Sequence, residues 1–423
     1  MNKESAIFIM NTKYLKDKRS SLLLAVMCFT MYAFVYMTKD MFSSAMASVV
    51  ENGIMTKSQT GAINAMFWLV YTPCQILGGF AADRYSPSLL ICIGIVGNAV
   101  ANIVIFFNQS YLVIMIAWMF AAAIQFGVWP STFKIISTQV DKKYRSGALF
   151  LLMFSTNLGI VFSKLVATFV PHWKINFLVS FVVLIILLVA WCLVYSPLKK
   201  QMVLSDEAAV SEEKADINTS RQNGHSLRKS IIATGLICIV AVGFFYNVVS
   251  KAISMLTPTM LMESYESLSA SGATLLSIVM IVISTMGIFL FKVIQRRITK
   301  NEIKALSIML ILCIPFLAVS YFIGSIHYIC VLISLSVSLL LLSIAASFYN
   351  CIPMRYVYNG KSGTVAGMLN AAAAFANVLA SFVFAYMAEF LPWKFIIIAW
   401  GALVLIAVAL CLSVFRRWKN FIG

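Results

Sequence analysis

Apolar and polar stretches alternate along the whole 423-residue chain, with twelve long apolar runs separated by mostly short polar connections. A helix needs about 20 apolar residues to cross roughly 30 Å of hydrocarbon, and each run reaches about that length. The pattern predicts an all-α polytopic membrane protein with twelve transmembrane helices. The predicted spans are residues 20–50, 59–80, 88–107, 111–139, 147–170, 176–195, 230–262, 269–294, 303–324, 328–356, 363–389 and 393–415.

One connection is long and polar, from Ser196 to Lys229. It holds few large apolar residues, so it cannot bury enough surface to order itself as a folded unit. We interpret residues 196–229 as a cytoplasmic linker between an N-terminal six-helix bundle, 1–195, and a C-terminal six-helix bundle, 230–423. A short amphipathic segment around residues 206–215 remains an alternative inside this linker.

The two predicted bundles repeat several features at a nearly constant offset. Lys39 and Lys251 stand inside apolar runs 212 residues apart (251 − 39). Arg145-Ser146-Gly147 opens the fifth run, and Lys361-Ser362-Gly363 opens the eleventh, 216 residues later (361 − 145). Repeats of this kind predict two pseudo-symmetric bundles with a site between them at the bilayer midplane.

Charge placement supports a membrane protein. The chain is 61% hydrophobic and 11% charged, against about 25% charged residues in soluble domains. Its net charge of +17 comes mainly from Lys and Arg in the two tails and in every second connection. By the positive-inside rule this predicts cytoplasmic N- and C-termini in a bacterial-type plasma membrane, the inner membrane. It also predicts contact with membrane lipid and no nucleic-acid partner.

No sequence motif indicates an enzyme or a bound cofactor. The nine cysteines stand singly in apolar runs, and the three histidines stand in connections or at span ends. Neither set has the spacing of a metal site. The sequence shows no nucleotide-binding loop and no Ser-His-Asp arrangement. We therefore expect no metal, no cofactor and no enzyme activity.

Lys39 is the most informative single residue, because it lies near the middle of the first apolar run. A cation at that depth costs about 2.5–3.5 kcal/mol on insertion scales, so it usually faces a wet cavity or a partner. Together with Lys251 it predicts a cationic substrate site. Asp40 is a candidate counter-ion or proton carrier. The alternative for Lys39 is a fixed ion pair with Asp40 or with another helix.

The stretch Gly78-Gly79-Phe80-Ala81-Ala82-Asp83-Arg84-Tyr85-Ser86-Pro87 follows the second apolar run. It resembles the loop signature G-x-x-x-D-R-x-[GS] of the major facilitator superfamily. The resemblance implies twelve helices in two bundles. It also implies a conformational latch that includes Gly79, Asp83, Arg84 and Arg145. The alternative interpretation is a plain capped turn.

A narrower resemblance covers most of the chain. Several motifs are similar to those of the organophosphate:phosphate antiporter family, which includes glycerol-3-phosphate and hexose-6-phosphate carriers. The matching stretches are Tyr36-Met37-Thr38-Lys39-Asp40-Met41-Phe42 with Ala45-Met46, Trp129-Pro130-Ser131-Thr132-Phe133-Lys134, Arg145-Ser146-Gly147, Asn157-Leu158-Gly159 and Thr257-Pro258-Thr259-Met260-Leu261.

This resemblance implies a phosphate site with one arginine from each half. Here the first position is Lys39, the second falls on Ser250 beside Lys251, and a family histidine is replaced by Thr156. Arg binds phosphate with two parallel hydrogen bonds, whereas Lys is a point charge on a flexible stem. The sequence therefore favours an anion site and leaves phosphate and carboxylate ligands open.

Further candidates for the substrate site are polar, aromatic or basic side chains within the apolar runs. Any one of the aromatic residues could equally be a packing residue. Lys164 stands seven residues after Asn157 on the same predicted helix face and is expected near an outer vestibule. The remaining candidates are Tyr32, Tyr36, Trp129, Lys134, Asn157, Tyr246 and Asn247.

Together these features predict a secondary active transporter of a small organic anion that works by alternating access. Anion exchange and proton symport both remain open. We expect a monomer whose partners are the anionic substrate and membrane lipid. The alternatives are a neutral sugar or nucleoside carrier, a drug exporter, and a transporter-like ligand sensor.

Overall fold

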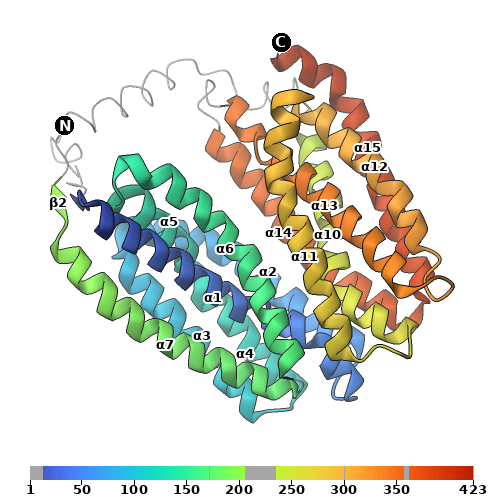
Figure 1. Ribbon diagram of the computed structural model, residues 1–423, viewed down its shortest axis with the longest axis horizontal. Helices are drawn as coiled ribbons and strands as arrows, with labels where there is room; N and C mark the ends of the chain where they lie inside the picture. Colours follow the sequence, from blue (N-terminus) through green and yellow to red (C-terminus); the bar gives the residue numbers. More distant parts are fainter. Residues whose placement is uncertain (1–12, 171, 205–234, 300, 357–361, 423) are drawn as a thin grey trace, which may run out of the picture.

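The computed structural model describes residues 13–170, 172–204, 235–299, 301–356 and 362–422. Nearly all of the described chain is helical (Figure 1). The first half contains β1 (Lys13–Tyr14), α1 (Lys18–Glu51), α2 (Lys57–Arg84), α3 (Pro87–Phe107), α4 (Tyr111–Ile124), η2 (Gln125–Gly127), α5 (Val128–Gln139), α6 (Lys142–Phe169), α7 (Trp173–Lys200) and β2 (Val203–Leu204). The second half contains α10 (Leu236–Ser264), α11 (Ala270–Arg297), α12 (Glu302–Ser320), α13 (Tyr328–Tyr349), η3 (Ile352–Tyr356), α14 (Ser362–Phe390) and α15 (Trp393–Ile422).

Eleven helical segments among the described residues are long and apolar enough to cross a membrane. In this set α4, η2 and α5 form one segment, 111–139. The remaining long helix, α2, carries many polar residues but has 28 residues, about 42 Å at 1.5 Å per residue, which is long enough to cross. The predicted all-α polytopic fold is confirmed, and the eleven segments together with α2 agree with twelve spans.

Local chemistry explains where several helices begin, bend and end. Asp17 and Thr56 cap the first turns of α1 and α2 with their side-chain oxygens, which satisfies backbone N–H groups that have no partner inside the helix. The predicted fourth span is broken by the 3₁₀ turn η2, which ends three residues before Pro130. Proline removes a hydrogen bond and so favours an irregular preceding turn.

The helices form two halves, α1 to α7 and α10 to α15 (Figure 1). Each half has its own buried apolar cluster or clusters, with fully buried Trp118 and Trp191 in the first half and Trp400 and Trp418 in the second. Residues 205–234, most of the predicted linker, lie outside the described residues. In the structure α7 continues five residues into the predicted linker, as far as Lys200, and includes Pro197.

The two halves meet at the end of the molecule opposite the chain termini (Figure 1). There the Lys57 ammonium lies 3.0 Å from the Glu263 carboxylate, which also accepts a hydrogen bond from the Trp393 indole at 3.0 Å. The backbone N–H of Ser58 donates to Glu389 at 2.7 Å. Gly61 packs so closely against α14 that an added Cβ would overlap atoms of that helix. These contacts close this end of the molecule, which we call the closed end.

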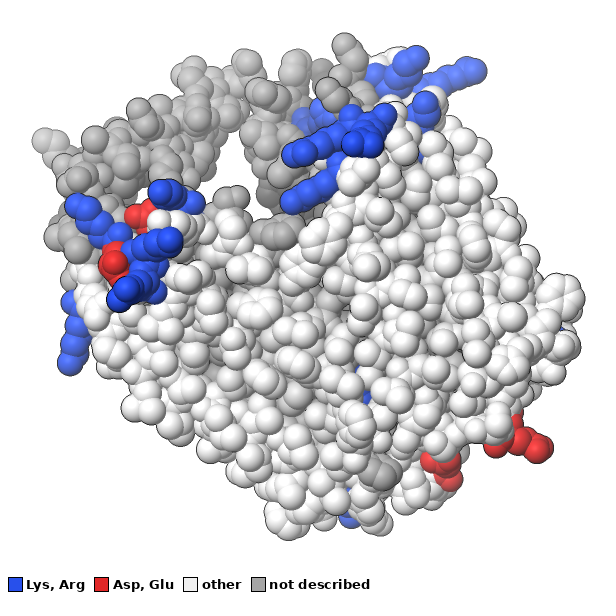
Figure 2. Space-filling view, in the orientation of Figure 1, with Lys and Arg blue, Asp and Glu red and all other residues white. Residues whose placement is uncertain are grey.

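The end that carries the termini has a different surface. Figure 2 shows most Lys and Arg side chains at this end together with a few Asp and Glu side chains, further Asp and Glu side chains at the closed end, and a broad band between the two ends almost free of charge. The surface is notched between the two halves at the basic end (Figure 2). A band without exposed charges is the surface that a bilayer requires.

Candidate functional site

Lys39 lies in an aromatic enclosure on the side of α1 that faces α2. Its ammonium lies 3.4 Å from the ring centroid of Tyr71, 4.7 Å from that of Trp68 and 5.0 Å from that of Tyr36. The residue is 8% exposed. The negative faces of aromatic rings attract an ammonium group when water is largely excluded. Among the described residues, no carboxylate lies within 4 Å of this ammonium, so the rings are its main support.

Lys251 comes from α10 in the other half and reaches the same place. Its ammonium lies 3.6 Å from Oδ1 of Asp40 on α1. It also lies 5.5 Å from the ring centroid of Trp68. The indole of Trp68 is therefore shared between Lys39 and Lys251. The structure brings together the two lysines that the repeat paired, at the interface between the halves.

Asp40 turns away from its neighbour Lys39. Adjacent helical residues point about 100° apart, and Asp40 forms its ion pair with Lys251. Its second oxygen, Oδ2, accepts hydrogen bonds from the hydroxyls of Ser44 and Ser163, both at 3.3 Å. These two hydroxyls are 2.8 Å apart. The acid thus pairs with the lysine of the other half and not with Lys39, its neighbour in sequence.

Lys164 adds a third ammonium group to this region. It is 2% exposed and lies within electrostatic range of Asp40 and Lys251. The sequence predicts it near an outer vestibule, and in this conformation it is buried. Three lysines and one described carboxylate thus share this region, and the ammonium of Lys251 is the one in direct contact with that carboxylate.

Close packing between α1 and α6 holds these groups in register. An added Cβ at Gly159 would lie 2.5 Å from the carbonyl oxygen of Ala33 and 2.8 Å from Cβ of Tyr36. Only glycine allows this approach, which brings Ser163 of α6 to Asp40. On another side, the amide of Asn98 on α3 donates to the hydroxyl of Thr38 at 2.6 Å. Contacts to two helices therefore fix the rotation of α1 around Lys39.

Tyr32, Tyr36 and Trp129 continue the aromatic lining along α1. The Tyr32 and Trp129 rings are 4.7 Å apart, and the Tyr32 and Tyr36 rings are 6.1 Å apart. Tyr36 contacts Lys39 directly. Asn157 and Thr156 lie on α6, the helix that packs against this part of α1, and both side chains are partly buried. This part of the predicted set forms one neighbourhood.

Two candidates from α10 make their contacts elsewhere. Tyr246 is 2% exposed and packs edge-to-face on Tyr349, with ring centroids 5.4 Å apart, inside the second half. The amide of Asn247 donates to the backbone oxygen of Gly243 at 2.7 Å, within its own helix. Asn247 stands four residues before Lys251, so these two residues share a helix face, whereas Tyr246 lies on another face.

Lys134 lies closer to the predicted latch than to Lys39. Its ammonium donates to the backbone oxygen of Ala82 at 2.6 Å. Ala82 is about 16 Å along α2 from Tyr71, at 1.5 Å per residue. The Arg145 guanidinium donates to the Val140 backbone oxygen at 3.4 Å. Gly79 and Asp83 belong to α2, but their side-chain surroundings lie outside the described residues, and Arg84 is exposed. The latch therefore stays a prediction.

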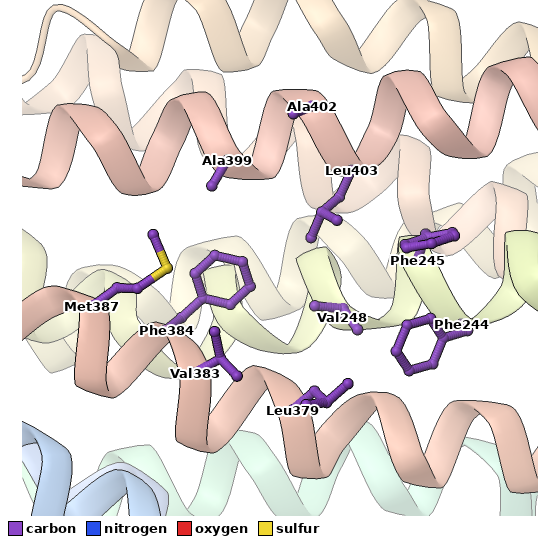
Figure 3. Close-up of a pocket in the computed structure, with 10 residues that line it drawn as sticks. All are labelled: Phe244, Phe245, Val248, Leu379, Val383, Phe384, Met387, Ala399, Ala402 and Leu403. Carbon is purple, nitrogen blue, oxygen red and sulfur yellow. The ribbon is translucent and has the colours of Figure 1, made fainter.

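An apolar cavity of about 390 Å³ lies elsewhere, between α10, α14 and α15 (Figure 3). Side chains from all three helices point into it, including Phe245, Phe384 and Leu403 (Figure 3). All ten lining residues are apolar. The cavity therefore lacks the charged groups that a site for a small anion needs, and the lysine cluster remains the stronger candidate.

The sequence places Trp68 and Tyr71 among the aromatic residues that could line a cavity, but it does not assign them to Lys39, and it does not indicate Ser44 and Ser163. Ser44 stands four residues after Asp40, and Trp68 and Tyr71 are three residues apart, so each pair shares a helix face. These spacings are visible in the sequence. The missing information was the rotation of α2 and α6 relative to α1.

Comparison with known proteins adds the family. A sequence model described as Major Facilitator Superfamily matches residues 28–380. The chain belongs to the major facilitator superfamily. This confirms the predicted superfamily and favours membrane transport over an enzyme activity.

Curated relatives of this superfamily member agree with the narrower resemblance. They include the membrane sensor protein UhpC of Salmonella typhimurium, 24% identical over 152 residues, which are 35% of this chain and 34% of the relative. A probable hexose phosphate transport protein of Chlamydia trachomatis is 22% identical over 128 residues, 30% of this chain and 28% of the relative. These alignments thus span about a third or less of each relative.

Solved structures of other superfamily members share the fold. A bacterial homologue of the human lysosomal transporter Spinster, inward-facing and occupied, has a TM-score of 0.72 at 13% identity, covering 95% of this chain and 98% of that one. A POT family transporter in complex with 5-aminolevulinic acid has a TM-score of 0.74 at 12% identity, covering 96% and 97%. At these identities the likeness concerns the fold alone.

Proposed function

We propose that this superfamily member is a secondary active transporter that moves a small organic anion across the plasma membrane. Phosphorylated sugars and other phosphorylated metabolites are the first class of substrate to test. The observation that carries the proposal is the group of three lysines, Lys39, Lys164 and Lys251, which shares one described carboxylate, Asp40, in the interior of the protein. Each buried cation costs several kcal/mol of desolvation unless a counter-charge accompanies it. A bound anion supplies that charge.

The location of the cluster supports alternating access. Lys39 and Asp40 belong to the first half and Lys251 to the second. A ligand held by both lysines would therefore couple the halves. The closed end and the notch at the opposite end correspond to one of the two conformations that such a carrier needs. With the termini in the cytoplasm, as the basic end indicates, this conformation is open to the cytoplasm.

Relatives bear on the substrate. One is called a probable hexose phosphate transport protein, which agrees with an anionic, phosphorylated ligand. Lysines at both positions also suit a carboxylate, because an ammonium group has no preferred planar geometry. The ion pair between Asp40 and Lys251 favours a counter-ion role for Asp40 over a proton carrier. A drug exporter usually places acids in its cavity, so the three lysines disfavour that alternative.

A ligand sensor is a second candidate, because two relatives are called membrane sensor protein UhpC. A sensor would bind the anion at the same cluster without moving it. Counterflow in proteoliposomes distinguishes the two functions. Proteoliposomes that contain a carrier and are loaded with glucose 6-phosphate accumulate labelled glucose 6-phosphate from outside, whereas proteoliposomes that contain a sensor do not.

Ligand-induced stabilisation of the purified protein tests the anion site. We expect an organic anion, with glucose 6-phosphate, glycerol 3-phosphate and dicarboxylates in the panel, to raise the melting temperature of the wild type. Lys39→Gln and Lys251→Gln should each weaken that ligand at least about tenfold, the loss of one charge-assisted contact. Lys143→Gln, an exposed lysine at the basic end, is the matched control. If the ligand raises the melting temperature of all four proteins equally, the two-lysine site is wrong.

A further inference from the structure

The ion pair between Asp40 and Lys251 connects the two halves inside the membrane. It joins α1 to α10 at 3.6 Å, and the two side chains are 10% and 16% exposed. The two oxygens of Asp40 have separate partners. Oδ1 faces Lys251, and Oδ2 accepts hydrogen bonds from Ser44 and Ser163. Asp40 is therefore held in place by the first half and directed at the second.

The charges around this pair are strongly unequal. Lys39 and Lys164 are 8% and 2% exposed and lie within electrostatic range of the pair. Among the described residues, Asp40 is the acid that pairs with Lys251 and lies within electrostatic range of Lys39 and Lys164. Without Asp40 the cluster would hold three lysines and no carboxylate in the empty protein. Such a cluster resists any conformation that excludes water from it.

We propose that Asp40 is an internal substitute for the anionic substrate. When the site is empty, Asp40 neutralises Lys251. The halves can then pass, without bound substrate, through the intermediate in which both ends are closed. This inference rests on the proposed function and deepens it. It makes the protein a carrier that can return empty and perform net transport. A cluster of unpaired lysines would instead allow only exchange of one anion for another.

The surroundings of Asp40 also explain how substrate replaces it. An incoming anion competes with Asp40 for Lys251. The released carboxylate keeps its hydrogen bonds from Ser44 and Ser163, and it stays near the buried ammonium of Lys164. Asp40 therefore does not become an unpaired buried charge when it gives up Lys251. In this scheme Asp40 is a positioning residue that acts through Lys251.

Opening of the closed end in ligand-free protein tests the proposal directly. Asn64 is 4% exposed, and its amide lies 3.7 Å from Sδ of Met255, between α2 and α10. In a variant that lacks the nine native cysteines, Asn64→Cys becomes accessible only when that end opens. The measured quantity is the rate of modification by a membrane-impermeant maleimide in proteoliposomes without any ligand.

We expect Asp40→Asn to slow this modification at least about tenfold, because the empty cluster then holds an unpaired Lys251. The double variant Asp40→Asn/Lys251→Gln should recover to within about threefold of the wild type, since removing both members of a buried pair is far less costly than removing one. Lys143→Gln, which changes an exposed lysine at the basic end, is the control and should also stay within about threefold of the wild type.

Two results would overturn the inference. One is an Asp40→Asn protein that reacts as fast as the wild type, and the other is a double variant that stays as slow as the single one. The melting temperatures of all variants distinguish slow opening of the closed end from a folding defect. If Asp40→Asn does not fold, Asp40→Ser repeats the test with a smaller neutral side chain. The maleimide assay contains no ligand, whereas the stabilisation screen measures anion binding. A screen in which no anion binds would therefore refute the proposed function, whatever the maleimide assay shows.

Discussion

At the scale of single residues, the site depends on how each buried lysine is compensated. Lys251 has a carboxylate at 3.6 Å, whereas Lys39 has three aromatic rings and no carboxylate within 4 Å among the described residues. A substrate that binds Lys251 must first displace the carboxylate of Asp40. Aromatic faces release an ammonium group more easily, because no opposite charge has to be displaced. Lys39 is therefore the lysine that is most available to a substrate.

Replacement of Tyr71 tests this compensation. Tyr71→Leu removes the ring nearest the Lys39 ammonium, and we expect it to lower the free energy of unfolding by about 1–2 kcal/mol through loss of a desolvated cation–π contact. Tyr71→Phe keeps the ring and should stay within about 0.5 kcal/mol of the wild type. Thermal unfolding of the three proteins in the same detergent gives the comparison. Equal losses in both variants would show that the hydroxyl matters and the ring face does not.

At the scale of helices, the sequence predicts the spans better than their rotations. The apolar runs indicated the spanning helices, and the cost of burying a lysine indicated Lys39 and Lys251. The partners of these lysines depend on how α2 and α6 are turned against α1, and that is decided by close contacts such as the one at Gly159. Irregular turns such as η2 are equally hidden, because Gln125–Gly127 lies inside an apolar run.

Two glycines of α6 allow a matched test of helix packing. An added Cβ at Gly159 would meet backbone atoms of α1 at 2.5–2.9 Å, whereas at Gly147 it would meet nothing within 4 Å. Backbone cannot move aside as a flexible side chain does, so Gly159→Ala should cost about 1–3 kcal/mol of stability through overpacking. Gly147→Ala should be neutral or stabilise the helix by up to about 1 kcal/mol. A Gly159→Ala protein that melts with the wild type would exclude this contact as a determinant of the site.

At the scale of the whole molecule, two kinds of polar contact connect the halves. One is the ion pair between Asp40 and Lys251 inside the membrane. The other is the set of polar contacts at the closed end, where Glu263 binds both Lys57 and Trp393. The first is buried and keeps its strength in salt, whereas the second is partly exposed and is screened. A carrier needs this second set to be weak, because it must break each time the closed end opens.

Glu263→Gln should therefore shift the empty protein toward the state that is open at this end. The side chains of Lys57 and Glu263 are 16% and 29% exposed, and pairs of that kind contribute up to about 1 kcal/mol, which corresponds to roughly a two- to fivefold change in population. We expect the maleimide reaction of Asn64→Cys to accelerate by about that factor.

Because salt screens exposed charges, the acceleration should shrink when the wild type and the variant are compared at about 1 M salt. Glu266→Gln changes a neighbouring exposed acid of the same connection and should leave the rate unchanged. An equal acceleration in both variants would point to the general charge of this end, and no acceleration in either would exclude Glu263 as a contact that holds it closed.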